Sequence, residues 1–234
     1  MNTTKKKSIS TVLAILVIAL VAPFVFMLSA CGSKLNVREV STQEELKLAI
    51  ADEKVDEIKL TSNIDSDGNF EISRKVTIDL NGKTLKGNGA NGVILAVADA
   101  DVTITGNGTI IAKESSDRYA MVIWARYNSK VTIEDGIFTQ EITGPDSQYD
   151  MIYITESAQL TIEGGKFDCH TPKWTLNIQD KDVATAKFIV KGGIFKGYNP
   201  AEAMTEPNSP VNFVAEGYES VLIKGTTDYK VVIA

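Results

Sequence analysis

One cysteine and the single histidine of the chain are neighbours, in Asp168-Cys169-His170. A thiol and an imidazole can bind a transition metal or act as nucleophile and base. Adjacent residues of a strand point to opposite faces, however, and the chain has no second histidine to complete a zinc site. We therefore expect a turn after Phe167 with Cys169 tucked inside, and we expect neither a metal site nor a cofactor.

Two glutamates could act as a pair. Glu134 and Glu163 each follow a short apolar strand pattern, and on stacked strands they would share one outward row with Asp79, Thr105 and Lys191. Stacked carboxylates raise one another's pKa or attract a cation, and two carboxylates are the minimum for acid–base cleavage of a glycosidic bond. Acids on an exposed sheet are usually a solvated surface, and Lys191 offsets their charge, so we interpret this row as surface.

A third candidate group combines aromatic and basic side chains. Trp124 and Tyr153 occupy equivalent outward positions on successive strands, which lie about 4.8 Å apart in a sheet, so they would form a flat exposed step beside Arg126. Sugar rings stack on such faces, and a guanidinium binds a uronate carboxylate through two hydrogen bonds. Trp124, Arg126 and Tyr153 are our candidate ligand-binding residues; the alternative is peripheral packing under a long loop. The two outward rows are Leu95, Trp124, Tyr153 and Asn177, then Val97, Arg126, Thr155 and Gln179.

A repeat must position these residues. Five segments share a strand-like triplet, in four of them apolar-Thr-apolar, followed by glycine and a bulky apolar residue. Short strands at this period leave no room for helices between them, which excludes a doubly wound α/β sheet. A solenoid with two or three strands per turn fits, because stacked turns share one core. The triplets, 76–78, 102–104, 131–133, 160–162 and 188–190, start 26, 29, 29 and 28 residues apart.

The expected fold is therefore all-β: a right-handed parallel β-helix of about seven coils, with residues 38–234 as a single domain. Ser41-Thr42-Gln43-Glu44 has a capping-box pattern, followed by apolar residues at helical spacing. We expect a short helix over about 42–52 that covers the open end of the first coil. Residues 211–234 form either a last coil or a C-terminal cap.

Residues 40–85 resemble the start of pectin-lyase-like right-handed β-helices, through Thr42-Gln43-Glu44-Glu45-Leu46 and the run from Val76 to Leu85. The repeat extends the resemblance over roughly residues 37–198. This superfamily includes lyases, hydrolases, phage tail proteins and adhesins, so the resemblance implies a fold more than an activity. The calcium-binding carboxylates and Arg-Pro motifs of pectate lyases are not visible, and Ile123-Trp124-Ala125-Arg126 lacks their Asp-His continuation. The stacked aspartates of β-helical glycoside hydrolases are also missing.

The first thirty residues have the layout of an export signal. Lysines at positions 5–7 precede an uncharged run over residues 11–28. The motif Leu28-Ser29-Ala30-Cys31-Gly32 resembles a bacterial lipobox, in which the cysteine thiol carries the lipid. We expect residues 1–30 to be a lipoprotein signal peptide, Cys31 to be lipidated and residues 31–37 to be a tether; a retained transmembrane anchor and a plain cleaved signal are the alternatives.

The net charge and the positions of the long connections also bear on function. The net charge of the 234-residue chain is −6, and removing the lysine-bearing signal leaves −9, which argues against a nucleic-acid partner. The long connections follow similar corners, so they should cluster along one side, where binding usually occurs. They are residues 112–118, 139–150, 168–173 and 196–210, and they carry Glu141, Asp146, Asp150, Asp168, Lys173, Glu202 and Glu206.

These observations predict a lipid-anchored protein on the extracytoplasmic side of a bacterial cell membrane. Its partners would be the membrane, through the anchor, and a glycan or cell-surface protein bound by the β-helix. The missing lyase and hydrolase motifs favour a non-catalytic, adhesive role. The alternatives are a polysaccharide lyase or glycoside hydrolase that uses the acidic loops on an anionic polysaccharide, and a purely structural surface protein.

Overall fold

The computed structural model describes residues 35–143, 149–204, 206 and 210–234. The predicted signal peptide, Cys31 and the first part of the tether lie outside these residues, so these assignments stay predictions. In the part of the chain that is described, no helix is both long and apolar enough to cross a membrane.

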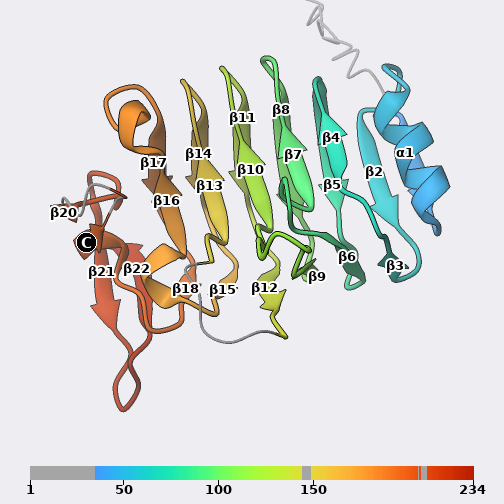
Figure 1. The fold of residues 1–234 in the computed structure, drawn as a ribbon. Coiled ribbons are helices and arrows are strands. Elements are labelled where there is room, and N and C mark those ends of the chain that lie inside the picture. Colours follow the sequence, from blue (N-terminus) through green and yellow to red (C-terminus); the bar gives the residue numbers. More distant parts are fainter. Residues whose placement is uncertain (1–34, 144–148, 205, 207–209) are drawn as a thin grey trace, which may run out of the picture. The chain divides into compact units, whose positions relative to one another are not determined.

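The repeated triplets form the first sheet, sheet A, of parallel strands (Figure 1). Their apolar residues are buried and their middle residues face outward, so that Thr77, Thr103, Thr132 and Thr161 lie in one row. This alternation is what a half-buried strand requires. Sheet A contains β1 (Val37–Val40), β2 (Glu57–Leu60), β5 (Lys75–Asp79), β8 (Asp101–Thr105), β11 (Lys130–Ile133), β14 (Gln159–Ile162) and β17 (Lys187–Val190).

The bulky residue after each corner glycine begins the second sheet, sheet B, and points into the core. Phe167 stacks between Phe138 and Phe195, with ring centroids 5.0 and 4.7 Å apart. The parallel strands of sheet B are β3 (Ile64–Asp65), β6 (Thr84–Asn88), β9 (Thr109–Lys113), β12 (Ile137–Glu141), β15 (Lys166–Asp168) and β18 (Ile194–Phe195).

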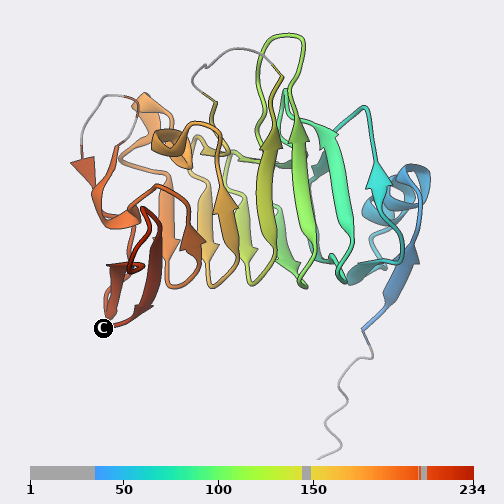
Figure 2. The same cartoon turned by 90° about the horizontal axis from the view of Figure 1, so that it is seen from below.

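The third sheet, sheet C, carries the candidate aromatic residues. It is reached from sheet B through the long connections, whose described residues lie along one side, as predicted (Figure 2). Its five parallel strands are β4 (Phe70–Ile72), β7 (Ile94–Ala96), β10 (Ile123–Ala125), β13 (Ile152–Ile154) and β16 (Leu176–Ile178). Short 3₁₀ helices lie in the later connections: η1 (Pro172–Trp174), η2 (Asp180–Asp182) and η3 (Pro200–Glu202).

The all-β parallel β-helix is confirmed, but the expected number of coils is too high. Because sheet C has five strands among the residues that the structure describes, at most five coils are complete on all three sides there, and not about seven. The corner glycines act in two ways. Gly165 has φ +98°, which disfavours other residues, whereas a Cβ at Gly108 would collide with the carbonyl oxygen of Lys83.

The predicted N-terminal helix is present as α1 (Gln43–Ala51), with its capping box shifted by one residue. Thr42, and not Ser41, is the N-cap: its Oγ1 accepts from the backbone N–H of Glu45 at 3.2 Å. Glu45 in turn accepts from the backbone N–H of Ser41 at 2.7 Å. Leu46 and Ala49 are fully buried and close the first coil.

The C-terminal residues form a cap and not a further three-sided coil. Val214 makes an isolated parallel bridge to Val190, after which the chain turns into an antiparallel hairpin of β21 (Tyr218–Leu222) and β22 (Tyr229–Ile233). Strand β22 pairs antiparallel with β18 and so covers the last edge of sheet B. A smaller antiparallel pair, β19 (Ala203–Met204) and β20 (Pro210–Val211), precedes it.

Candidate functional site

The outer face of sheet C presents the aromatic row in the predicted register. Leu95, Trp124, Tyr153 and Asn177 are paired on successive strands. Trp124 and Tyr153 are half-buried, with ring centroids 6.0 Å apart and planes at 47°. The step is therefore tilted and not flat, and a sugar ring could stack on one ring while it contacts the edge of the other. Leu95 and Asn177 are buried, so the two ends of the row are covered.

Arg126 is held beside this row by neighbours that the sequence did not reveal. Its guanidinium lies between the rings of Trp124 and Tyr127, 4.7 and 4.6 Å from their centroids. Its Nη2 forms an ion pair with Glu156 at 3.2 Å, and Glu156 also accepts from the backbone N–H of Tyr127. Glu156 therefore occupies the place that we expected for a ligand carboxylate. Glu156 lies one coil after Arg126 in the chain, so the sequence showed no sign of this pairing.

Hydrogen bonds connect Glu156 to the aromatic row. Thr155 donates to Glu156 at 2.6 Å and accepts from the indole N–H of Trp124 at 3.2 Å. Burial raises the pKa of Glu156, but the hydrogen bonds from Thr155, Arg126 and Tyr127 outweigh it, so the pKa lies below its usual value. Trp124 is thus fixed at its N–H edge while its ring remains partly exposed.

Carboxyl groups from two long connections converge beyond Tyr153. The side-chain N–H₂ of Asn177 donates to Asp150 at 2.8 Å and to Glu206 at 3.2 Å. Glu206 also lies close enough to the Tyr153 hydroxyl to act on its pKa. Burial, together with the charge of Glu206, raises the pKa of Asp150 to about 6, and burial and Glu206 raise that of Tyr153. We call Asp150, Tyr153, Asn177 and Glu206 the acidic cluster.

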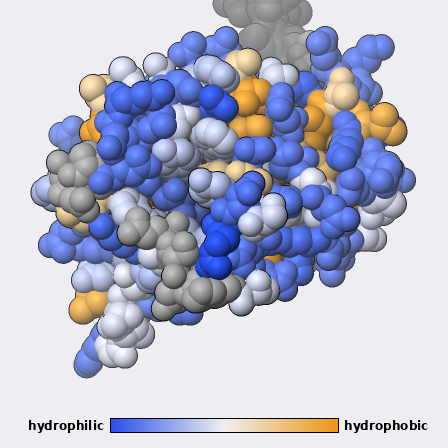
Figure 3. Space-filling view, in the orientation of Figure 1, coloured by the Kyte–Doolittle hydropathy of each residue, from blue (hydrophilic) through white to orange (hydrophobic). Residues whose placement is uncertain are grey.

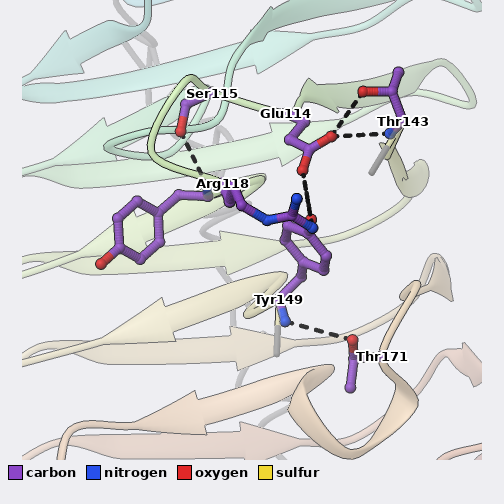
Figure 4. A network of polar contacts seen from close by, with 7 residues as sticks. Glu114, Ser115, Arg118, Thr143, Tyr149 and Thr171 are labelled. Carbon is purple, nitrogen blue, oxygen red and sulfur yellow. Dashed lines mark hydrogen bonds and ion pairs between the residues drawn. The ribbon is translucent and has the colours of Figure 1, made fainter. Parts of the chain in front are cut away.

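A second polar network fastens the long connections to one another (Figure 4). Glu114 accepts from the backbone N–H and the hydroxyl of Thr143, both at 2.9 Å, and from the Tyr149 hydroxyl. Arg118 donates to the same Tyr149 hydroxyl at 2.8 Å, and Tyr149 N–H donates to Thr171 at 3.4 Å. Three successive connections are therefore tied together beside sheet C. Sequence reasoning placed these connections on one side but had no signal for the contacts.

The two other candidate groups behave as surface and core. Lys191 pairs with Glu163 at 2.9 Å, as expected for an offset surface charge. Cys169 is buried, its thiol contacts the Thr171 carbonyl at 3.1 Å, and burial raises its pKa to about 12. His170 is exposed and its ring packs edge-on against Tyr149. Among the residues the structure describes, no group of three or more His, Cys, Asp or Glu side chains could hold a metal ion. Asp146 lies outside the described residues.

The three parallel sheets and their long connections define a pectin-lyase-like parallel β-helix, as predicted from the sequence. Residues 37–135 match the family described as "Putative pectate lyase-like adhesive domain". This match covers less than half of the chain, and the same coil architecture continues through β18. Neither a curated protein nor a solved structure gives a significant match.

Proposed function

We propose that this protein is a surface adhesin whose β-helix binds a glycan on the outer face of sheet C. The partly exposed Trp124–Tyr153 pair carries the proposal, because two rings at 6.0 Å on adjacent strands offer a preformed surface for a sugar. The adhesive family matched by residues 37–135 supports the same role. The side of the molecule seen in Figure 3 is mainly hydrophilic, which suits a polar ligand better than a large apolar partner.

A glycan array with the full-length protein tests the proposal. Trp124→Ala should weaken binding of any captured glycan at least about tenfold, because it removes the stacking surface, a loss of about 1.4 kcal/mol. Tyr229→Ala, which removes a half-buried tyrosine from sheet B, is the matched control and should leave binding unchanged. Binding that survives both Trp124→Ala and Tyr153→Ala would place the ligand elsewhere, and no binding at all would reject the glycan role.

We also propose that lipidated Cys31 anchors the domain on the extracytoplasmic side of the cell membrane. The proposal rests on the lipobox-like motif and the preceding apolar run. In cells given a labelled fatty acid, the wild-type protein should carry label and sediment with membranes, whereas Cys31→Ala should do neither. Equal labelling of Cys31→Ala would reject the anchor, and unlabelled but membrane-bound protein would favour a retained transmembrane segment.

One observation favours a second function, hydrolysis of a glycosidic bond. A carboxyl group with a pKa near 6 can act as a general acid close to neutral pH, and Asp150 lies beside a second carboxyl group, Glu206. Release of reducing ends from the polysaccharide that the protein binds, abolished by Asp150→Asn, would establish this activity. Absence of product at high protein concentration would leave binding as the function.

A further inference from the structure

The surroundings of Tyr153 are acidic. Asp150 and Glu206 share the amide nitrogen of Asn177, and Asp182 lies close enough for its charge to act on Tyr153. The charged groups with the largest effect on Tyr153 are the carboxyl groups of Glu206, Asp150 and Asp182. A ligand on this half of the face therefore enters a strongly negative field.

Arg126 does not neutralise that field. Its guanidinium is paired with Glu156 at 3.2 Å and enclosed by the rings of Trp124 and Tyr127. A uronate carboxylate would have to displace Glu156 and would also approach the acidic cluster. A free arginine on this face would favour anionic sugars. Because Arg126 is already paired, the face is unsuited to them.

Asn177 adds an independent observation. Its side chain is almost fully buried, its N–H₂ group is aimed at the two carboxylates, and its Oδ1 has no hydrogen-bond partner. An unpaired buried acceptor is unfavourable, and the Asn177 amide is neutral, so it does not compensate the charge of the two carboxylates. A ligand group that brings both N–H donors and positive charge would add donors and a countercharge for the carboxylates.

We propose that this face binds a glycan that carries free primary amines, that is, unacetylated amino sugars. The sugar ring stacks on Trp124, and its ammonium group lies against the acidic cluster, where its three N–H donors meet the carboxylates of Asp150 and Glu206. This assignment deepens the proposed function and rests on it, because both use the outer face of sheet C.

Calorimetric titration of the full-length protein near neutral pH tests the assignment with three matched oligosaccharides: a glucosamine hexamer, its fully N-acetylated counterpart and hexagalacturonate. The glucosamine hexamer should bind at least about tenfold more tightly than the acetylated one, and its advantage should fall as salt screens the charges. Asp150→Asn and, separately, Glu206→Gln should each reduce this preference, whereas Glu163→Gln, at the corner after β14, should not. Two variants keep the test valid if one of them fails to fold.

The possible failures are distinguishable. Acetylated and free-amine hexamers that bind equally, both through Trp124, would overturn the amine assignment and leave the glycan role intact. Tighter binding of hexagalacturonate would overturn it as well. No binding of any of the three, or binding insensitive to Trp124→Ala, would count against both proposals.

Discussion

At the scale of single residues, Asp150 links the acidic cluster to folding. Its pKa is raised from 3.8 to about 6 by burial and by the charge of Glu206, against a hydrogen bond from Asn177 that lowers it. Between these two values the unfolded chain has released the proton while the folded protein still holds it. Stability therefore falls as pH rises through this interval and is level above it.

We expect Asp150→Asn to remove this pH dependence. The amide stays neutral, so the free energy of unfolding of the variant, relative to wild type, should rise by on the order of 2 kcal/mol between pH 4 and pH 7. Urea unfolding at a series of pH values measures it, with Asp99→Asn at an exposed corner as the control. A difference between wild type and Asp150→Asn that does not change with pH would show that Asp150 titrates normally.

Arg126 and Glu156 give a second prediction at this scale. Breaking their ion pair should cost about 1 kcal/mol, because both side chains are more than two-thirds buried and Arg126 also contacts two rings. In a double-mutant cycle with Arg126→Met and Glu156→Gln, chemical denaturation should give a coupling energy of that size. A coupling near zero would mean that the aromatic contacts alone hold Arg126.

These residues show what the sequence could and could not predict about the site. The alternation of short strands placed Trp124 and Tyr153 in one row, because register follows from the inward apolar residues. It could not show that Glu156, from the next corner, would take the guanidinium, or that Asp150 and Glu206 would meet at Asn177. Such contacts depend on the paths of long connections, for which the sequence has no periodic signal.

At the scale of elements, Arg74 fastens the N-terminal helix α1 to the first coils of the β-helix. It follows β4 and donates to the carbonyl oxygens of Ile50, Ala49 and Val55 at 2.6, 2.8 and 2.7 Å. The last carbonyls of a helix lack most of their helical partners, although the N–H of Asp52 reaches Ala49 at 3.3 Å, and a cation there also favours the helix dipole. The capping box at the other end was misplaced by one residue because Ser41–Glu44 and Thr42–Glu45 fit the same pattern.

Arg74→Met should therefore lower the free energy of unfolding by about 2–3 kcal/mol, since it removes three part-buried hydrogen bonds from a charged donor. The neighbouring substitution Lys75→Met is the matched control. Lys75 is exposed and its pair with Asp101 is long, at 3.8 Å, so its loss should change stability by less than about 0.5 kcal/mol. Equal effects in urea denaturation would show that Arg74 does not hold α1 in place.

At the scale of the whole domain, the fold was predictable because the same constraint recurs in each coil. A repeat with inward apolar residues and a corner glycine is compatible with few folds, and stacking buries the apolar residues of all coils in one core. The coil number was overestimated because that expectation treated nearly all of residues 38–234 as coils. In the structure α1, the long connections and the β21–β22 hairpin use part of this length without adding a three-sided coil.

The β21–β22 hairpin therefore covers the end of sheet B in a way that a further coil could not. A last coil would leave another open edge, whereas antiparallel β22 covers β18, which contains the buried Phe195.

Deleting residues 217–234 should expose this edge and produce concentration-dependent self-association, together with a lower melting temperature. Light scattering after size-exclusion chromatography would measure the first and calorimetry the second. The control replaces only the turn between β21 and β22, which keeps the pairing with β18; a deleted protein that stayed monomeric and equally stable would show that the hairpin is not the cap.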